Sequence, residues 1–259
     1  MYRELIHIYG PFGIQSYGVA LVIGLMVFTY LVLNDQRRAS LLTIDQALSL
    51  VTQGILAAII GGRMLFVAMS WDHLSWTEII AVWDGGFSVL GSIIGVIVVL
   101  ALSLHINRIP IYGFLDLVSL YAPVLQAIAR LGCLCAGCCF GSPCRWPWAI
   151  VFSDPQGYAP IGIGLHPTQL YSSLMLAGSF VLLILIRKYT NIPGIIFGSY
   201  LVLAGLERLI LDLFRADREL VHGGLLHGLS IHQLIAFCIV LAGIIVLATA
   251  YGSYRRRQL

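Results

Sequence analysis

Charged residues are scarce in this chain. They make up 10% of its 259 residues, whereas soluble domains carry about 25%, and lysine occurs only at Lys188. Basic residues exceed acidic ones by only 15 to 12, a margin too small to suggest nucleic-acid binding. Hydrophobic residues make up 59% of the chain, and the mean hydropathy is +0.92. We therefore predict an all-α integral membrane protein.

The sequence also shows no internal repeat and no low-complexity segment, and we expect no cleaved secretory signal. No short basic stretch with a small-residue cleavage site stands at the N-terminus, so we interpret the first apolar run as a membrane helix. We expect one polytopic membrane domain over residues 1–259.

Seven stretches are long and apolar enough to span a bilayer, which needs about 20 residues. They are residues 15–33, 46–69, 86–104, 112–134, 168–186, 194–214 and 230–252. The loops after the first, third and fifth stretches, together with the C-terminal tail, hold eight basic residues, and the opposite loops hold four. The positive-inside rule then predicts seven transmembrane helices with the N-terminus outside and the C-terminus in the cytoplasm.

Three arginines, Arg63, Arg130 and Arg208, lie within or at the edges of these stretches. A charge in the hydrocarbon zone is costly, so it usually serves a substrate or a partner. One interpretation is that the arginines form structural ion pairs with nearby acids. The alternative is a lipid-phosphate site, since the arginine fork matches phosphate oxygens in two-point contact. Three arginines near the outer ends of three spans favour the phosphate site.

The end of the sixth stretch repeats this pattern. Arg208 and Asp212 are spaced i, i+4 and share a helix face, and Arg215 follows Arg208 by two turns. The stripe is typical of a phosphate-binding ladder whose acid positions the arginines. A self-satisfied ion-pair network is the alternative.

Five of the six cysteines lie between residues 133 and 144. Cys135 and Cys138 have Cys-x-x-Cys spacing, but a second such pair or paired histidines are missing, so the signal for a metal site is weak. A disulfide between Cys144 and an earlier cysteine is a second possibility. Our default is that these cysteines are small buried fillers in a tight turn. We expect no metal and no cofactor.

Polar motifs flank the fifth stretch and precede the last one. In the segment 166–171, Thr168 is placed to cap a helix that Pro167 turns into. The same segment offers His166, Gln169 and Tyr171 as donors or as a base at headgroup depth. Two loop histidines, His222 and His227, are weaker candidates for a base.

The motifs occur in an order that resembles the prolipoprotein diacylglyceryl transferase family, and the resemblance covers nearly the whole chain. The matching segments are Tyr17–Gly18, Gly61–Arg63, Trp83–Gly95, Arg130–Gly141, His166–Tyr171, Arg208–Arg215 and Leu229–Gln233. Any one of them alone would be weak, whereas together they are specific.

The resemblance implies a seven-helix bacterial inner-membrane enzyme. Family members transfer the diacylglyceryl group of phosphatidylglycerol to the cysteine thiol of a lipoprotein signal peptide and release glycerol phosphate. The resemblance implies catalytic roles for Arg130, Arg208, Arg215 and His166. It implies substrate-binding roles for Tyr17, Arg63, Gly132, Gly137, Gly141, Gln169, Tyr171 and Asp212. The expected partners are phosphatidylglycerol, prolipoprotein signal peptides and membrane lipids, without nucleic acid.

The sequence also departs from the family pattern. The family's histidine after the Gly-Gly-x-Ser stretch is Leu90, which can neither bind a proton nor hold an anion. Polar family positions in the core motifs are occupied here by Cys133, Ala136, Cys138, Ser142 and Ser172. The lipid-headgroup side of the site is therefore expected to be retained, and the acceptor side to differ.

Three functional hypotheses remain open at this stage. The first is diacylglyceryl transfer to prolipoproteins, or transfer of a phosphatidylglycerol-derived group to another acceptor. The second is a non-catalytic protein that binds anionic lipid, which Leu90 favours. The third is a thiol-redox protein that uses the cysteine cluster. The residue that replaces the missing histidine stays open, with His166, His222 and the cysteines as candidates.

Overall fold

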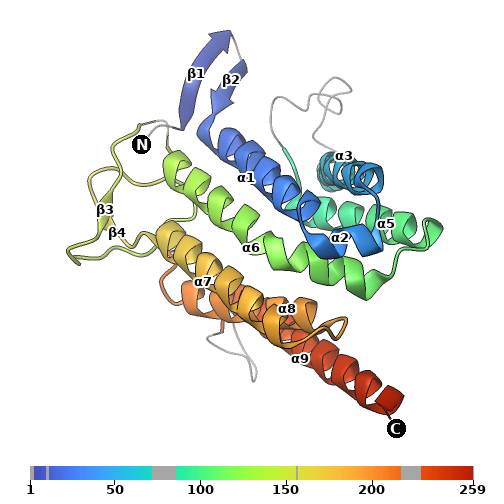
Figure 1. Cartoon of the computed structure of the whole chain (residues 1–259). Helices are drawn as coiled ribbons and strands as arrows, with labels where there is room; N and C mark the ends of the chain where they lie inside the picture. The colour runs from blue at the N-terminus through green and yellow to red at the C-terminus, as the bar shows by residue number, and fades with distance from the viewer. Residues whose placement is uncertain (1–2, 10–11, 72–85, 156, 217–228, 259) are drawn as a thin grey trace. The chain divides into compact units, whose positions relative to one another are not determined.

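The computed structural model describes residues 3–9, 12–71, 86–155, 157–216 and 229–258 (Figure 1). The helices of this part are α1 (Ser16–Leu33), α2 (Gln36–Leu41), α3 (Ile44–Met69), α5 (Val89–Ile106), α6 (Ile111–Ala136), α7 (Thr168–Tyr189), α8 (Ile195–Asp212) and α9 (Ile231–Gln258). Two small sheets pair β1 (Glu4–Tyr9) with β2 (Phe12–Gln15), and β3 (Ile150–Val151) with β4 (Gly164–Leu165).

The predicted all-α membrane architecture is confirmed. In the described ranges, six helices are long and apolar enough to cross a bilayer: α1, α3, α5, α6, α7 and α9. The helix α8 covers most of the sixth predicted stretch, but its last six residues hold Glu207, Arg208 and Asp212. Seven spans and the orientation of the termini therefore stay predictions.

The chain forms two compact units. The first comprises residues 1–7, 13–32 and 115–259, and the second comprises residues 8–12 and 33–114. The boundary falls inside α6. The expected single membrane domain stays a prediction.

In the second unit, α3 and α5 pack closely through glycines. A Cβ on Gly61 would lie 2.5 Å from the carbonyl oxygen of Gly91, and a Cβ on Gly95 would lie 2.5 Å from that of Ala57. Ser92 Oγ donates to the carbonyl of Ala58 at 2.8 Å across the same seam. The two helices also border an apolar groove of about 690 Å³.

In the first unit, two sets of contacts hold α8 in place. The carboxylate of Asp116 on α6 accepts from the backbone N–H groups of Gly194 and Phe197 at 2.7 and 2.8 Å, which places a negative charge at the N-terminus of α8. On its other side α8 packs on α9 through Gly198, Gly205 and Gly243, where backbones approach too closely for a side chain.

The Gly205→Ala substitution tests this packing. The added Cβ would lie 2.5 Å from Val240 Cγ2 and 2.9 Å from the carbonyl of Ala236, and overpacking of this kind costs about 1–3 kcal/mol. We expect the thermal midpoint in detergent, followed by tryptophan fluorescence, to fall by several degrees. Gly178→Ala in α7 is the control, because nothing lies within 4 Å of its added Cβ. Equal midpoints for both variants would contradict this account.

Candidate functional site

Three arginines of the first unit line one small pocket. Arg130 comes from α6, Arg208 from α8 and Arg215 from the segment after α8. The other lining residues are Cys139, Thr168, Gln169, Ser172 and Leu211. The three arginines are only partly buried, and each of the other two charges acts on Arg208. Three like charges that converge in this way favour an anionic ligand.

A crossing of three backbone segments fixes the position of Arg215. Gly141 pairs with Arg215 in an antiparallel bridge, and its N–H donates to the carbonyl of His166 at 3.0 Å. Ser142 N–H donates to the carbonyl of Phe214 at 2.7 Å. A Cβ on Gly141 would lie 2.6 Å from His166 Cβ and 2.7 Å from the carbonyl of Phe214. This crossing therefore requires glycine at 141, and the expected substrate-binding role of Gly141 stays a prediction.

The first turn of α7 holds the loop that follows α6. Thr168 Oγ1 donates to the carbonyl of Cys139 at 2.6 Å, and Gln169 Nε2 donates to the carbonyl of Cys138 at 2.7 Å. The prediction that Thr168 caps α7 is wrong: Pro167 takes the cap position, without a side-chain cap bond. The threonine hydroxyl instead binds the backbone carbonyl of Cys139. This partner is 29 residues away, so local sequence spacing does not reveal it.

Gln169 leaves one polar atom unused. Its side chain is 1% exposed and lines the pocket. The amide nitrogen is bonded to Cys138, but the buried Oε1 has no hydrogen-bond partner in the described part of the chain. A buried acceptor without a partner costs about 1–3 kcal/mol, so this oxygen is placed to accept a hydrogen bond from a bound ligand.

Two buried carboxylates lie behind the arginines on α8. Ser172 Oγ donates to Glu207 Oε1, and Ser230 Oγ donates to Asp212 Oδ2 at 2.7 Å. Ser230 and Gln233 also exchange hydrogen bonds at the start of α9. Asp212, with 0% exposure, is thus tied to the start of α9 and does not line the pocket. Its expected substrate-binding role stays a prediction.

His166 and Tyr171 belong to an aromatic cluster beside the pocket, and neither lines it. His166 Nδ1 lies 3.3 Å from Tyr171 Oη, which accepts from Trp148 Nε1 at 2.8 Å. The histidine ring also stacks edge-on against Phe214, with centroids 5.3 Å apart. The side chain is therefore held in a fixed orientation by its neighbours.

The other predicted residues of the first unit shape the end of α6. A Cβ on Gly132 would lie 3.2 Å from Tyr17 Cα and 2.6 Å from Ala20 Cβ, so Gly132 lets α1 approach α6 closely. Tyr17 itself is 40% exposed. Gly137 has φ +70° at the residue after α6, a conformation that favours glycine.

Arg63 lies in the second unit. Its Nη1 donates to the carbonyl of Gly86 at 2.9 Å, and its guanidinium faces the rings of Phe66 and Phe87. Leu90, where the family has histidine, is on the first turn of α5 and is 61% exposed. The role of Arg63 in substrate binding stays a prediction. His222 and His227 lie outside the described residues.

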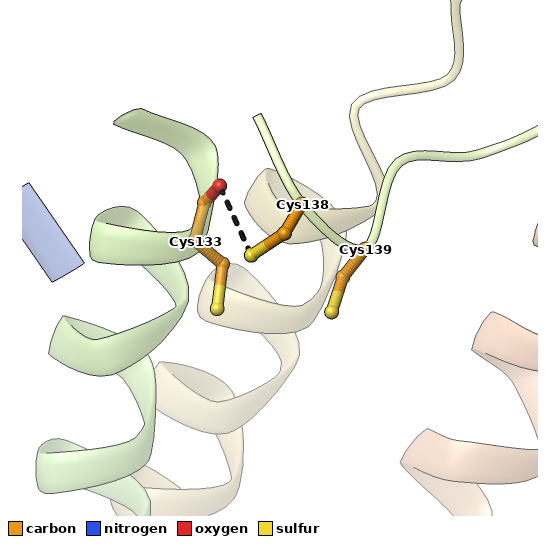
Figure 2. A group of neighbouring side chains, drawn as sticks. All are labelled: Cys133, Cys138 and Cys139. Carbon is orange, nitrogen blue, oxygen red and sulfur yellow. Dashed lines mark hydrogen bonds between the residues drawn. The ribbon is translucent and has the colours of Figure 1, made fainter. Parts of the chain in front are cut away.

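The structure brings together three cysteines that sequence spacing does not single out. All six cysteines are free, so the structure does not contain the disulfide considered between Cys144 and an earlier cysteine. The sulfur atoms of Cys133, Cys138 and Cys139 lie within 4.8 Å of one another, whereas Cys135 is exposed and outside the group (Figure 2). The Cys-x-x-Cys pair of residues 135 and 138 is therefore not the pair that converges.

Helix capping explains this grouping. The N–H of Cys138 donates to the carbonyl of Cys133 at 3.1 Å, and the N–H of Gly137 donates to that of Leu134 at 3.3 Å. With a left-handed Gly137, this is a Schellman motif, which folds the second residue after the helix back over its last turn. The sequence signal for the cluster is Gly137, with Cys133 four residues before it and Cys138 directly after it.

The pKa values of the Cys138 and Cys139 thiols are shifted in opposite directions. Hydrogen bonding to Cys133, then to Cys138, lowers the pKa of the Cys139 thiol, and the charges of Arg215 and Arg130 add to this effect against burial. Hydrogen bonding to Cys133 and Cys139 raises the pKa of Cys138. Negative charge in this cluster is therefore favoured on Cys139, the member that lines the arginine pocket.

Comparison with known proteins gives a consistent result. Residues 3–249 match the family described as prolipoprotein diacylglyceryl transferase. The chain is 31% identical to the phosphatidylglycerol–prolipoprotein diacylglyceryl transferase of Clostridium tetani, over 91% of this chain and 93% of the relative. It is 32% identical to the enzymes of that name from the Wolbachia of Brugia malayi (94% and 93% covered) and from Rhodospirillum rubrum (93% and 89% covered).

The match extends over almost the entire chain and includes the segments that form the arginine pocket. This protein therefore belongs to the prolipoprotein diacylglyceryl transferase family.

Proposed function

We propose that this protein transfers the diacylglyceryl group of phosphatidylglycerol to the lipobox cysteine of prolipoproteins. Family membership makes it a transferase of this type. In the reaction a carbon–sulfur bond forms to the acceptor thiolate and the carbon–oxygen bond to the phosphate breaks. The electron pair of that bond leaves with glycerol phosphate, and the thiol proton passes to a base.

The observation that carries the proposal is the convergence of Arg130, Arg208 and Arg215 on one pocket. The two buried carboxylates Glu207 and Asp212 act on Arg208 with the opposite sign to the other two arginines. Three guanidinium groups against two carboxylates give a formal excess of positive charge, which suits the negative charge of a phosphodiester. The pocket thus fits the lipid headgroup better than it fits a neutral ligand.

The arginines would contribute most as the carbon–oxygen bond breaks. Charge then builds up on the phosphate oxygens, and guanidinium groups already in place stabilise it without reorganisation. Arg130 and Arg208 hold the phosphate in this proposal, and Arg215 guides the headgroup in. The free Oε1 of Gln169 accepts from a hydroxyl of the glycerol headgroup.

Activation of the acceptor thiol is assigned to the neighbourhood of His166. Imidazole takes up a proton near neutral pH, and the contact with Tyr171 orients this ring. The ring lies beside the pocket rather than in its lining, so a proton would reach it through Tyr171 or water. Gly132, Gly137 and Gly141 support the site by allowing the close backbone approaches described above.

We also propose the membrane arrangement that this reaction needs. The chain spans the bacterial inner membrane seven times as a single domain, with α8 as the sixth span. The N-terminus lies outside and the C-terminus in the cytoplasm, because the basic residues gather on the C-terminal side. The arginine pocket then opens at outer-leaflet depth, where Tyr17 contacts lipid. In the second unit, Arg63 also contacts lipid in this proposal.

Substitution of the pocket arginines tests the phosphate assignment. In membranes with labelled phosphatidylglycerol and a lipobox peptide, we expect Arg130→Ala and Arg208→Ala to lower kcat/KM by about 100-fold or more, as loss of an oxyanion-stabilising donor does. Arg130→Lys should recover only part of this, because lysine keeps the charge and loses the fork. Arg145→Ala, an exposed arginine of the same unit, is the control. Thiol alkylation that is unaffected in both pocket variants would contradict the assignment.

A second candidate function is anionic-lipid binding without catalysis. It is favoured by Leu90, a leucine at the position of the family's histidine, which leaves that position without a proton acceptor. We expect the protein to complement a bacterial strain depleted of its diacylglyceryl transferase and to restore lipidated prolipoprotein on gels. The Arg130→Ala variant, expressed to the same level, should fail. Tight phosphatidylglycerol binding combined with no complementation and no thioether product would favour the second candidate.

A further inference from the structure

We propose that Cys133, Cys138 and Cys139 form a three-thiolate site for a zinc(II) ion, with the fourth coordination position open to a thiol. The three side chains extend from the end of α6 and from the loop behind it into one space (Figure 2). Only the identity of the fourth ligand, the acceptor cysteine of a prolipoprotein, rests on the function proposed above.

The spacing of the sulfur atoms suits the ion. Zinc–sulfur bonds are about 2.3 Å long, so two sulfurs of a tetrahedral site lie about 3.8 Å apart. The three sulfurs here lie within 4.8 Å of one another. A closure of about 1 Å or less, within the reach of χ1 rotation, would bring them onto a common ion. Thiolate donors select soft ions such as zinc over magnesium or calcium.

The backbone already holds the donors in place. The Schellman motif fixes Cys138 beside Cys133, and Cys138 Sγ lies 3.7 Å from the carbonyl oxygen of Cys133. Thr168 and Gln169 bind the carbonyls of Cys139 and Cys138. Little further ordering is therefore needed for the ion to bind.

Backbone strain at Cys139 is a second indication. Its φ is +58°, in the left-handed region that costs a non-glycine residue about 1–2 kcal/mol. A small residue such as glycine or asparagine would relieve this cost, whereas cysteine does not. Strain of this kind gathers at functional sites, where the surroundings hold a side chain in a required position. Here the required position turns the third thiol toward the other two.

The coordination count points to an open site. Among the described residues, no fourth histidine, cysteine or carboxylate joins the three thiols. Structural zinc sites have four protein ligands, whereas catalytic ones have three and leave one position for water or substrate. Because Cys139 also lines the arginine pocket, the three thiols adjoin the place proposed for the lipid phosphate. An acceptor thiol bound there would give up its proton more readily, to the base assigned above near His166, and would react as a thiolate.

The charges are compatible with this site. Three thiolates and one zinc(II) ion carry a net charge of −1, and guanidinium groups of the adjacent pocket lie close enough to offset it. The zinc site would also give a role to two family departures, since Cys133 and Cys138 supply two of the three ligands.

The first test measures the metal itself. Full-length protein with a non-histidine affinity tag is purified in detergent under reducing conditions, loaded with zinc and analysed by plasma mass spectrometry. We expect one zinc per chain. Serine substitution of Cys133, Cys138 or Cys139 should weaken zinc binding by about 100-fold or more, since even changes behind a ligand cost 10–100-fold. Cys135→Ser and Cys238→Ser are the controls, because both thiols are exposed and outside the group.

A second measurement uses the unaltered protein, so it does not depend on how the variants fold. Zinc should protect Cys133, Cys138 and Cys139 from alkylation, as read by peptide mass spectrometry, and leave Cys135 and Cys238 reactive. Equal reactivity of all the thiols with and without zinc would overturn the site. So would a zinc content of the unaltered protein that is no higher than that of the Cys133, Cys138 and Cys139 variants.

The fourth ligand is tested on cobalt(II)-loaded protein. A lipobox peptide with cysteine should strengthen the thiolate-to-cobalt charge-transfer absorption, and the same peptide with serine should leave the spectrum unchanged. Identical spectra with both peptides would overturn the assignment of the fourth ligand. Neither spectrum depends on product formation, so a failure of the transferase proposal would appear separately, as metal and peptide binding without a thioether product.

Discussion

The gathering of three guanidinium groups at the ends of apolar helices is the constraint on which the rest of this structure depends. Such groups need compensating charges and hydrogen bonds, because neither the bilayer nor a protein core supplies them. The chain meets this need with the buried carboxylates Glu207 and Asp212, each bonded to a serine from another element. Three guanidinium groups thus stand against two buried carboxylates in this part of the chain.

The backbone around the pocket serves the same end. Gly141 allows three chain segments to cross at one point, and that crossing places Arg215 beside the start of α7. The first turn of α7 in turn fixes the carbonyls of Cys138 and Cys139. The arginines and the cysteines thus share one scaffold, so a change to the scaffold acts on both groups together.

Hydropathy was enough to predict the long apolar helices, because membrane spans need long apolar runs, but it did not predict the short helix α2. The predicted stretch 112–134 became α6 at residues 111–136, and 168–186 became α7 at 168–189. Arg130, Arg208 and Arg215 could also be singled out, since a charge in an apolar run is conspicuous. Local spacing could not predict partners that are distant in sequence. The carboxylate of Asp212 accepts a hydrogen bond from Ser230, and the hydroxyl of Thr168 donates to the carbonyl of Cys139. The family resemblance supplied the function, but it could not show that three cysteines converge.

The composition of α8 has a consequence for how the protein is made. An arginine or aspartate near the centre of a span disfavours insertion by about 2.5–3.5 kcal/mol each, while leucine, isoleucine, phenylalanine or valine returns only about 0.3–0.6 kcal/mol. Glu207, Arg208 and Asp212 lie in the final two turns of α8, and α8 is not among the described helices that are apolar enough to cross a bilayer. Its glycine seam with α9 and the carboxylate of Asp116 at its start offer compensation only once the neighbours are present. As the sixth span proposed above, α8 would therefore enter the bilayer together with α9.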